Sequence, residues 1–238
     1  MTSRDFQSRM MSAWKALAST PIMLAVVVAA GCSGGSPTSP TTTTPPPPAG
    51  TAAVTASAQS GIQSATVFAF SAQTTNLTAG ALTYRWDFGD GTSSTDATPT
   101  RVFTAAGRYT VAVTVSDSRQ SARAETAVTV HSIAGRWVSA SGLTTMTLTQ
   151  SGSAISGSLS TTALSNGNVY PNCAISGSAR NEAPVVLLNR PVCRHPTLNS
   201  QLVAAEVRLD LDGEGQSLSG VIIEPAPFGQ NSVTYRRQ

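Results

Sequence analysis

The chain has 238 residues, of which 11% are charged and 5% aromatic, so it has room for one large or two small domains and favours β-structure over helix bundles. The formal net charge is +3, but three of the 15 basic residues and one of the 12 acidic residues precede Cys32, which leaves +1 for the rest. No basic tract remains after Cys32, which argues against a nucleic-acid partner. The only lysine, Lys15, precedes Cys32, so the mature chain would have no catalytic or phosphate-binding lysine.

Residues 1–31 have the features of a bacterial export signal. Three basic residues lie in the first 15, and an uncharged, largely apolar run follows that is short for a membrane span. The run ends in Ala29-Ala-Gly-Cys32, which resembles the lipobox of bacterial lipoproteins, although Ala29 stands where leucine is commonest. The resemblance implies cleavage before Cys32, a lipid anchor on its thiol and, with Ser33 next, an outer-membrane destination. An ordinary secretory signal and an uncleaved anchor helix are the alternatives.

Residues 32–50 are predicted to be a linker. They include runs of four threonines and four prolines and almost no apolar side chain, so they cannot form a core. The prolines favour an extended polyproline II stem of about 3 Å per residue, which would hold the folded part away from the membrane.

Residues 51–131 are predicted to form an immunoglobulin-like β-sandwich. Apolar residues alternate with polar ones in several short segments. The expected strands are 65–70, 82–88, 102–103, 109–115 and 127–130. In the second of these, Tyr84, Trp86 and Phe88 fall on one face and build the core, and Gly89-Asp90-Gly91 then forms a tight turn.

A resemblance to a known module rests on the same segment. This segment and those after it resemble the polycystic kidney disease (PKD) domain. The residues that carry the resemblance are Tyr84-Arg-Trp86-Asp87-Phe88-Gly89-Asp90-Gly91-Thr92, then Pro99–Phe103, Gly107-Arg-Tyr109 and Val113–Asp117. Arg101 and Phe103 stand where histidine and tyrosine are usual. The resemblance implies an extracellular Ig-like module that contacts protein or carbohydrate, or acts as a spacer, and is not catalytic. The Gly107–Tyr109 segment is similar to a tyrosine corner.

Four aspartates of this domain invite a metal or acid–base interpretation. They are Asp87, Asp90, Asp96 and Asp117. Calcium needs about six to eight oxygen ligands, and no clustered run of carboxylates supplies them. Aspartate beside glycine more often forms turns, so we predict no metal site and no cofactor.

Residues 132–238 are predicted to form a small antiparallel β-barrel of about eight strands, with an open sandwich as the alternative. The expected strands follow Gly135-Arg-Trp137 and include a hairpin turning at Gln150–Ser153. Further strands are expected around 174–175, at 185–188, 203–211 and 218–223, and at 232–235. The Gly135-x-Trp137 opening and the strand order resemble lipocalin-type calycin barrels. That resemblance implies a mouth for a small apolar ligand; a barrel filled by its own side chains is the competing interpretation.

Two cysteines, Cys173 and Cys193, remain after lipidation and are predicted to form one disulfide. A zinc or nucleophile site made by Cys193 and His195 is the weaker alternative, because no second ligand pair exists. The segment Leu209–Gly215 is similar to a calcium loop but is better explained as a hairpin turn at Asp212-Gly213. His131 is expected in a solvated interdomain linker.

The sequence carries no nucleophile elbow, HExxH or phosphate loop. The leading hypothesis is a non-enzymatic, lipid-anchored protein of the cell envelope, in the outer membrane. Its PKD domain would be a spacer or interaction module, and the second domain would recognise an envelope protein or carbohydrate. A small-ligand carrier and an accessory protein of a hydrolase are the alternatives.

Overall fold

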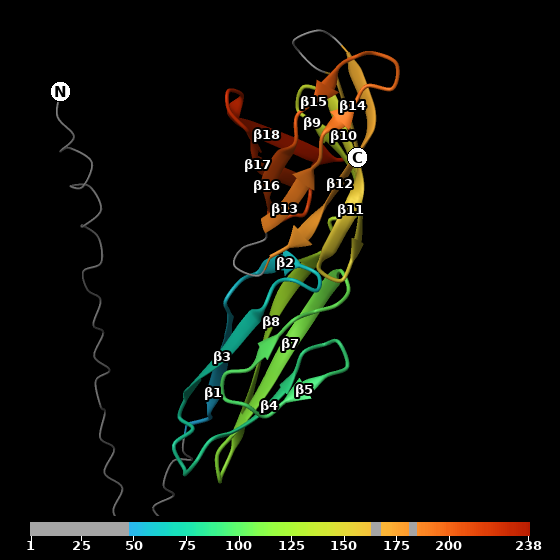
Figure 1. The fold of residues 1–238 in the computed structure, drawn as a ribbon. Helices are drawn as coiled ribbons and strands as arrows, with labels where there is room; N and C mark the ends of the chain where they lie inside the picture. Colours follow the sequence, from blue (N-terminus) through green and yellow to red (C-terminus); the bar gives the residue numbers. More distant parts are fainter. Residues whose placement is uncertain (1–47, 163–167, 181–184) are drawn as a thin grey trace, which may run out of the picture. The chain divides into compact units, whose positions relative to one another are not determined.

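The structure is a computed structural model that describes residues 48–162, 168–180 and 185–238, and every regular element in these ranges is a β-strand (Figure 1). The all-β prediction is confirmed. The predicted signal peptide, Cys32 and the linker up to residue 47 lie outside the described residues. In the described ranges no helix has the length and apolarity needed to cross a membrane.

The first domain is a sandwich of two sheets. Its strands are β1 (Thr51–Ala56), β2 (Ser60–Ile62), β3 (Phe68–Thr75), β4 (Thr83–Asp87), β5 (Ser93–Ser94), β6 (Thr100–Arg101), β7 (Gly107–Ser116) and β8 (Ser121–His131). One sheet has the order β1-β3-β6 and the other β2-β8-β7-β4-β5. All pairs are antiparallel except β2 with β8. This arrangement confirms the Ig-like sandwich.

The core of the sandwich follows the predicted alternation. Trp86 and Phe88 are buried, Tyr84 is half-buried, and the valines of β7 are inaccessible. The rings of Phe70 and Trp86 lie 6.1 Å apart, so an aromatic cluster joins the two sheets.

Three strand predictions are wrong in detail. The strand expected at 65–70 begins at Phe68 and continues to Thr75. The strand after Pro99 is Thr100–Arg101 instead of 102–103, because these residues pair with the start of β3 and the chain then leaves the sheet. Phe103 is nevertheless buried, stacked on Tyr109 at 4.1 Å between ring centroids. The last strand is far longer than 127–130, because β8 pairs with β7 along the whole length of that strand.

The predicted turn after β4 requires glycine. Gly89 and Gly91 have φ angles of 75° and 84°. A Cβ on Gly89 would lie 2.6 Å from the backbone oxygen of Thr110, so the turn also packs closely on β7.

The second domain is a closed barrel. Its strands are β9 (Gly135–Ser139), β10 (Thr144–Ser151), β11 (Ala154–Thr162), β12 (Val169–Ala179), β13 (Val185–Arg190), β16 (Ala205–Leu211), β17 (Ser217–Glu224) and β18 (Gly229–Arg237). Each strand pairs with the next one in the barrel, and β18 returns to β9 through pairs such as Tyr235 with Ser139. The barrel prediction is confirmed and the open sandwich is wrong. The strand expected from Val203 begins at Ala205.

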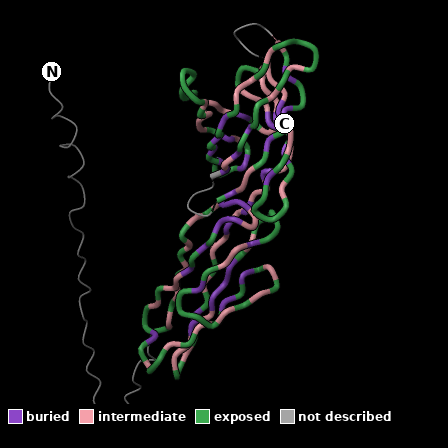
Figure 2. The backbone as a smooth tube through the Cα atoms, in the orientation of Figure 1, coloured by how far each residue is buried: buried purple, intermediate pink, exposed green. Residues whose placement is uncertain are grey.

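The barrel interior is occupied by its own side chains. Buried and exposed residues alternate along the strands (Figure 2), most regularly in β16. One buried cluster contains Trp137, Met146, Tyr170, Leu188 and Tyr235 together with other inward-facing residues. This packing favours the filled barrel over the ligand cup.

The two ends of the barrel differ. One end, which we call the distal end, carries the connections 140–143, 191–204 and 225–228. The other receives the chain from the first domain at 132–134 and carries the hairpin connection 212–216. Between β13 and β16, at the distal end, a small hairpin is formed by β14 (Cys193–Arg194) and β15 (Gln201–Leu202), which the sequence did not predict.

Candidate recognition surface at the distal end of the barrel

Exposed apolar side chains gather at the distal end. The large apolar residues of the barrel that are 42% to 58% exposed are Val169, Val192, Leu198, Ile223 and Phe228. They occupy the start of β12, the end of β17 and the connections between β13 and β18, all of which belong to this end. In the described ranges the first domain has one comparable residue, Val67. Apolar groups concentrated in this way commonly mark an interaction site.

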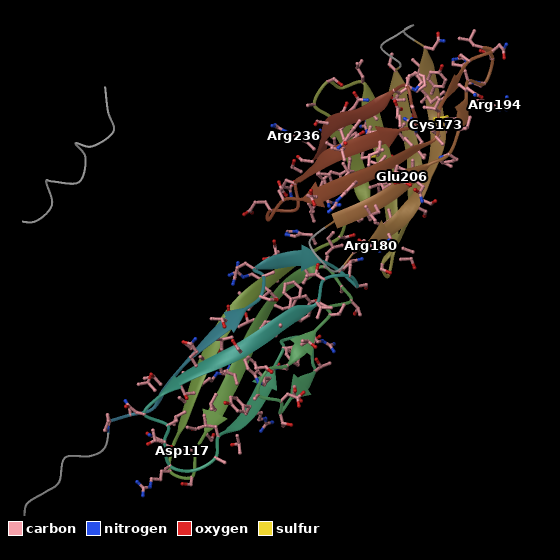
Figure 3. The ribbon with its side chains drawn as sticks, turned by 60° about the vertical axis from the view of Figure 1, so that its left-hand side comes forward. Asp117, Cys173, Arg180, Arg194, Glu206 and Arg236 are labelled. Carbon is pink, nitrogen blue, oxygen red and sulfur yellow. A yellow bond between two sulfur atoms is a disulfide. The ribbon has the colours of Figure 1, made fainter. Side chains whose placement is uncertain are left out.

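A disulfide fastens the small hairpin to the barrel. Cys173 on β12 and Cys193 on β14 are joined, with 5.5 Å between their Cα atoms, which confirms the predicted pair and rules out either sulfur as a metal ligand or nucleophile. Figure 3 shows Arg194, the next residue of the hairpin, at the end of the barrel near Cys173. Cys193 and Leu202 pack against the interior cluster, so the hairpin covers apolar residues at the distal end.

His195 organises the loop of this hairpin. Its Nδ1 accepts hydrogen bonds from the backbone N–H groups of Leu198 at 3.0 Å and Thr197 at 3.2 Å. Its ring meets the Tyr170 ring edge to face at 5.6 Å. The histidine that the sequence offered as a ligand is therefore used to shape a turn.

A hollow of about 630 Å³ is lined by residues of β12, β13, β16 and β17, by Pro191 and Ala204 at the two ends of the connection that carries the hairpin, and by Pro225. Arg190, the last residue of β13, continues the inward alternation of Val186 and Leu188 and is 6% exposed. Its Nη2 donates to Glu224 Oε1 at 2.7 Å and to the Val203 oxygen at 2.8 Å. Arg190 thus ties the return of the hairpin to the end of β17.

Two features mark Arg190 as unusual. Its buried Nε has no hydrogen-bond partner, which is costly in a folded protein. It also acts on Tyr235: burial raises the pKa of the Tyr235 phenol to about 12, while the nearby Arg190 charge works in the opposite direction. The sequence analysis missed Arg190. It could have been found from its position, because an arginine stands there where the alternation of β13 predicts a buried apolar residue.

The four aspartates of the first domain serve turns. Asp87 Oδ1 accepts the Gly89 N–H at 2.9 Å, and Asp96 Oδ2 accepts the Ser94 hydroxyl at 3.0 Å. Within the described ranges, no three His, Cys, Asp or Glu side chains lie close enough to hold a metal ion.

Asp90 and Asp117 are the most strongly held of the four. Burial alone would raise the pKa of Asp90, but hydrogen bonds from Thr92 and Arg101 and the Arg101 charge outweigh it, so the pKa lies below its ordinary value. Backbone N–H groups of Ala79, Arg119 and Gln120 lower the pKa of Asp117. Asp117 lies at the end of β7, where these bonds close the loop to β8 (Figure 3).

The aromatic motif residues are structural. The Trp86 indole N–H donates to the backbone carbonyl oxygen of Asp96 at 2.9 Å. Tyr109, near the Gly107 start of β7, donates its hydroxyl to the Ala105 oxygen at 2.8 Å, four residues upstream, as in a tyrosine corner.

The Gly135–Trp137 motif closes the barrel at the end opposite the hairpin. Trp137 is buried, and its indole N–H donates to the Ile133 oxygen at 2.9 Å. The Arg237 guanidinium lies 4.4 Å from the ring centroid and donates to the oxygens of Ser132, Ala134 and Gly215. Gly135 has a φ angle of 135°, a backbone conformation that residues with a Cβ rarely adopt, which explains the glycine.

His131 is not in a solvated linker, and that expectation is wrong. It is the last residue of β8, and its Nε2 lies 2.9 Å from the Gly213 oxygen. The hairpin connection predicted at Asp212-Gly213 spans 212–216, and its positive φ falls on Gly215. A Cβ on Gly215 would overlap the His131 ring, so the turn and the histidine fit together.

Comparisons with known proteins agree with the first domain. The model of the PKD-domain family matches residues 49–132. The chain is 52% identical to the collagenase ColA of Bacillus cereus over 50 residues, which are 21% of this chain and 5% of the collagenase. It is 50% identical to the pre-pro-metalloprotease PrtV of Vibrio cholerae serotype O1 over 38 residues, which are 16% of this chain and 4% of that protein.

Among solved structures, the PKD1 domain of the Vibrio cholerae metalloprotease PrtV is 28% identical, with a TM-score of 0.30, over 34% of this chain and 96% of that domain. The chain thus spans only 4% to 5% of the length of the two curated relatives, so the likeness concerns one module and not their protease activity. The first folded part of this chain, residues 49–132, is a PKD domain.

Proposed function

We propose that this protein is a non-enzymatic, lipid-anchored component of the cell envelope that recognises a partner with the distal end of its barrel. The PKD domain serves as a spacer or interaction module between the linker and the barrel. Cys32 carries the anchor, the destination is the outer membrane, and the partner is an envelope protein or carbohydrate, with no role for nucleic acid.

The gathering of exposed apolar side chains at the distal end is the observation that carries the proposal. Val192 and Leu198 lie on the connection 191–204, which the disulfide and the Arg190 bonds hold in place. A preordered surface loses less conformational entropy on binding than a mobile one, which suits a recognition role.

The shared PKD segment supports an accessory role. It makes up a small part of each protease that carries it, and its aspartates here hold turns. The filled interior, covered in part by the β14–β15 hairpin, speaks for surface recognition and against the alternative of a carrier with an internal cup.

Capture by the immobilised, lipid-free mature chain tests the recognition surface. Envelope proteins, glycans and lipids are offered to the wild type and to the double variant Leu198→Ser and Phe228→Ser. We expect the double variant to lose most of the captured material. Val67→Ser, which alters an exposed valine of the PKD domain, is the matched control and should retain it. Equal capture by all three proteins would refute the role of the distal end.

Fatty-acid labelling tests the anchor. Wild-type cells grown with labelled palmitate should yield a labelled protein in the outer-membrane fraction, and the Cys32→Ala protein should carry no label. A labelled Cys32→Ala protein would show that the anchor assignment is wrong.

A further inference from the structure

A row of polar side chains crosses the outer face of the barrel at the hollow. Ser176 pairs with Asn189, Asn189 with Glu206, and Glu206 with Ile223, on the adjacent strands β12, β13, β16 and β17. These four residues are exposed and line the hollow together. Because neighbouring strands lie about 4.8 Å apart, the row presents one side chain at each such step, a spacing comparable to the length of one sugar ring.

The rim of the hollow adds rigid and apolar surface. Pro191 and Pro225 follow the ends of β13 and β17, and Ile223 lies at one end of the polar row. The Arg190–Glu224 ion pair also lines the hollow. The site therefore offers hydrogen-bonding groups beside C–H surfaces, the combination that a pyranose ring requires.

The charges of the hollow disfavour an anionic ligand. Arg190 is its one cation and is already paired with Glu224. Glu206 also lines it and makes no ion pair in the described part of the chain. A phosphate, sulfate or carboxylate would meet this uncompensated carboxylate, whereas a hydroxyl group can donate to it. The serine hydroxyl and asparagine amide both donate and accept, which matches hydroxyls that do the same.

The topology disfavours a peptide added as an extra strand. Each of the four residues in the row is paired with a residue on both neighbouring strands, so no backbone edge is free for strand addition at the row itself. The row also contains no aromatic or unpaired arginine side chain of the kind that anchors protein partners.

We infer that this hollow binds a neutral oligosaccharide, with its hydroxyls on Ser176, Asn189 and Glu206 and its apolar edges against Ile223 and the rim prolines. The inference rests on the proposed function, since it names the ligand class of the distal recognition surface.

Two experiments test the inference. A glycan array is first probed with the mature chain carrying Cys32→Ser. The neutral oligosaccharide that gives the strongest signal is then titrated into the protein and followed by NMR. We expect saturable shifts of the Ser176, Asn189 and Glu206 amide signals. Glu206→Gln and Asn189→Ala should each weaken binding about threefold to tenfold. Asp210→Asn, on the same strand and outer face but outside the hollow, should change affinity less than about twofold.

Three results would overturn the inference: no neutral glycan retained on the array, preferential binding of sulfated or sialylated glycans, or full affinity in Glu206→Gln. If any of these occurs while Leu198→Ser and Phe228→Ser still abolish capture of an envelope protein, the glycan assignment fails and the proposed function stands. If capture is also unaffected, both fail.

Discussion

Tyr235 places a phenol in the barrel interior, where burial raises its pKa from 10.0 to about 12. Between these values the unfolded chain loses the phenolic proton and the folded chain keeps it. The unfolded state then binds fewer protons, so the free energy of unfolding falls as the pH rises. We expect the wild type to lose about 2 to 3 kcal/mol from this group between pH 9 and pH 12.

The Tyr235→Phe protein should lose correspondingly less stability over the same pH range, with little change at pH 7. Urea unfolding followed by tryptophan fluorescence at several pH values measures the difference. Parallel pH profiles for the two proteins would contradict the assignment of the raised pKa to Tyr235.

Asp90 contributes to the loss of stability at low pH. Its pKa lies below the ordinary value of 3.8, because hydrogen bonds from Thr92 and Arg101 outweigh the effect of burial. As the pH falls from about 5, the unfolded carboxyl takes up its proton first, so stability is lost until the folded pKa is passed. Asp90→Asn should flatten this loss in denaturant titrations between about pH 5 and pH 2. Asp96→Asn, which removes a carboxylate beyond β5 that makes no bond to Arg101, controls for the loss of one negative charge.

Among the strands, three glycines allow the barrel to close. Gly157, Gly177 and Gly220 face inward, and each lies directly opposite a buried leucine of the neighbouring strand. A Cβ on Gly177 would lie 1.8 Å from the Leu187 oxygen, and the other two approach backbone oxygens at 2.0 Å. Backbone cannot move aside as a flexible side chain can, so these positions require glycine.

Gly177→Ala should therefore destabilise the barrel by about 2 to 3 kcal/mol, within the range of overpacked cores. Thermal unfolding measured by circular dichroism reports the change. Ser178→Ala, the next residue on β12 with its side chain on the other face, should cost well under 1 kcal/mol. A Gly177→Ala protein as stable as the wild type would refute the close approach.

The strands also show where sequence reasoning succeeds. The alternation of apolar and polar residues around Trp86 and in β16 correctly predicted where the strands lie and which side chains face the core. The reason is that burial of one face of a strand imposes a period of two residues. The hairpin β14–β15 was missed because each of its strands has two residues, too few for a period. Phe103 was wrongly predicted to lie in a strand. Its apolar side chain indicated burial, but a residue in a loop can be buried in the core equally well.

The candidate site was less predictable. The cysteine pair was found by counting, but the polar row from Ser176 to Ile223 comes from four strands up to 47 positions apart in the sequence. Only the registers of the pairing strands bring these side chains together. The partner of Arg190 likewise lies on β17, so nothing local to Arg190 indicated Glu224.

The PKD domain and the barrel share buried residues. Ile62 and Ala65, from the PKD domain, belong to the same buried cluster as Trp137, and Ile133 joins them. The Gln150 amide of β10 accepts the Ile133 N–H and donates to the Gln63 oxygen, each at 3.0 Å. Unfolding either domain would expose apolar surface of the other and break these bonds, so the two domains should unfold together.

Incorporation of 5-fluorotryptophan into a protein that begins at residue 48 provides one reporter in each domain, because residues 48–238 contain only Trp86 and Trp137. In urea, the two fluorine signals of the wild type should lose intensity at the same midpoint. Ile62→Ala removes a side chain that fills the shared cluster, and it should separate the two midpoints. Val67→Ala, which truncates an exposed side chain of the same domain, should leave them together. The coupling depends on buried contacts between the domains. Distinct midpoints in the wild type would therefore mean that those contacts contribute little to stability. The PKD domain would then act as an independently folding spacer.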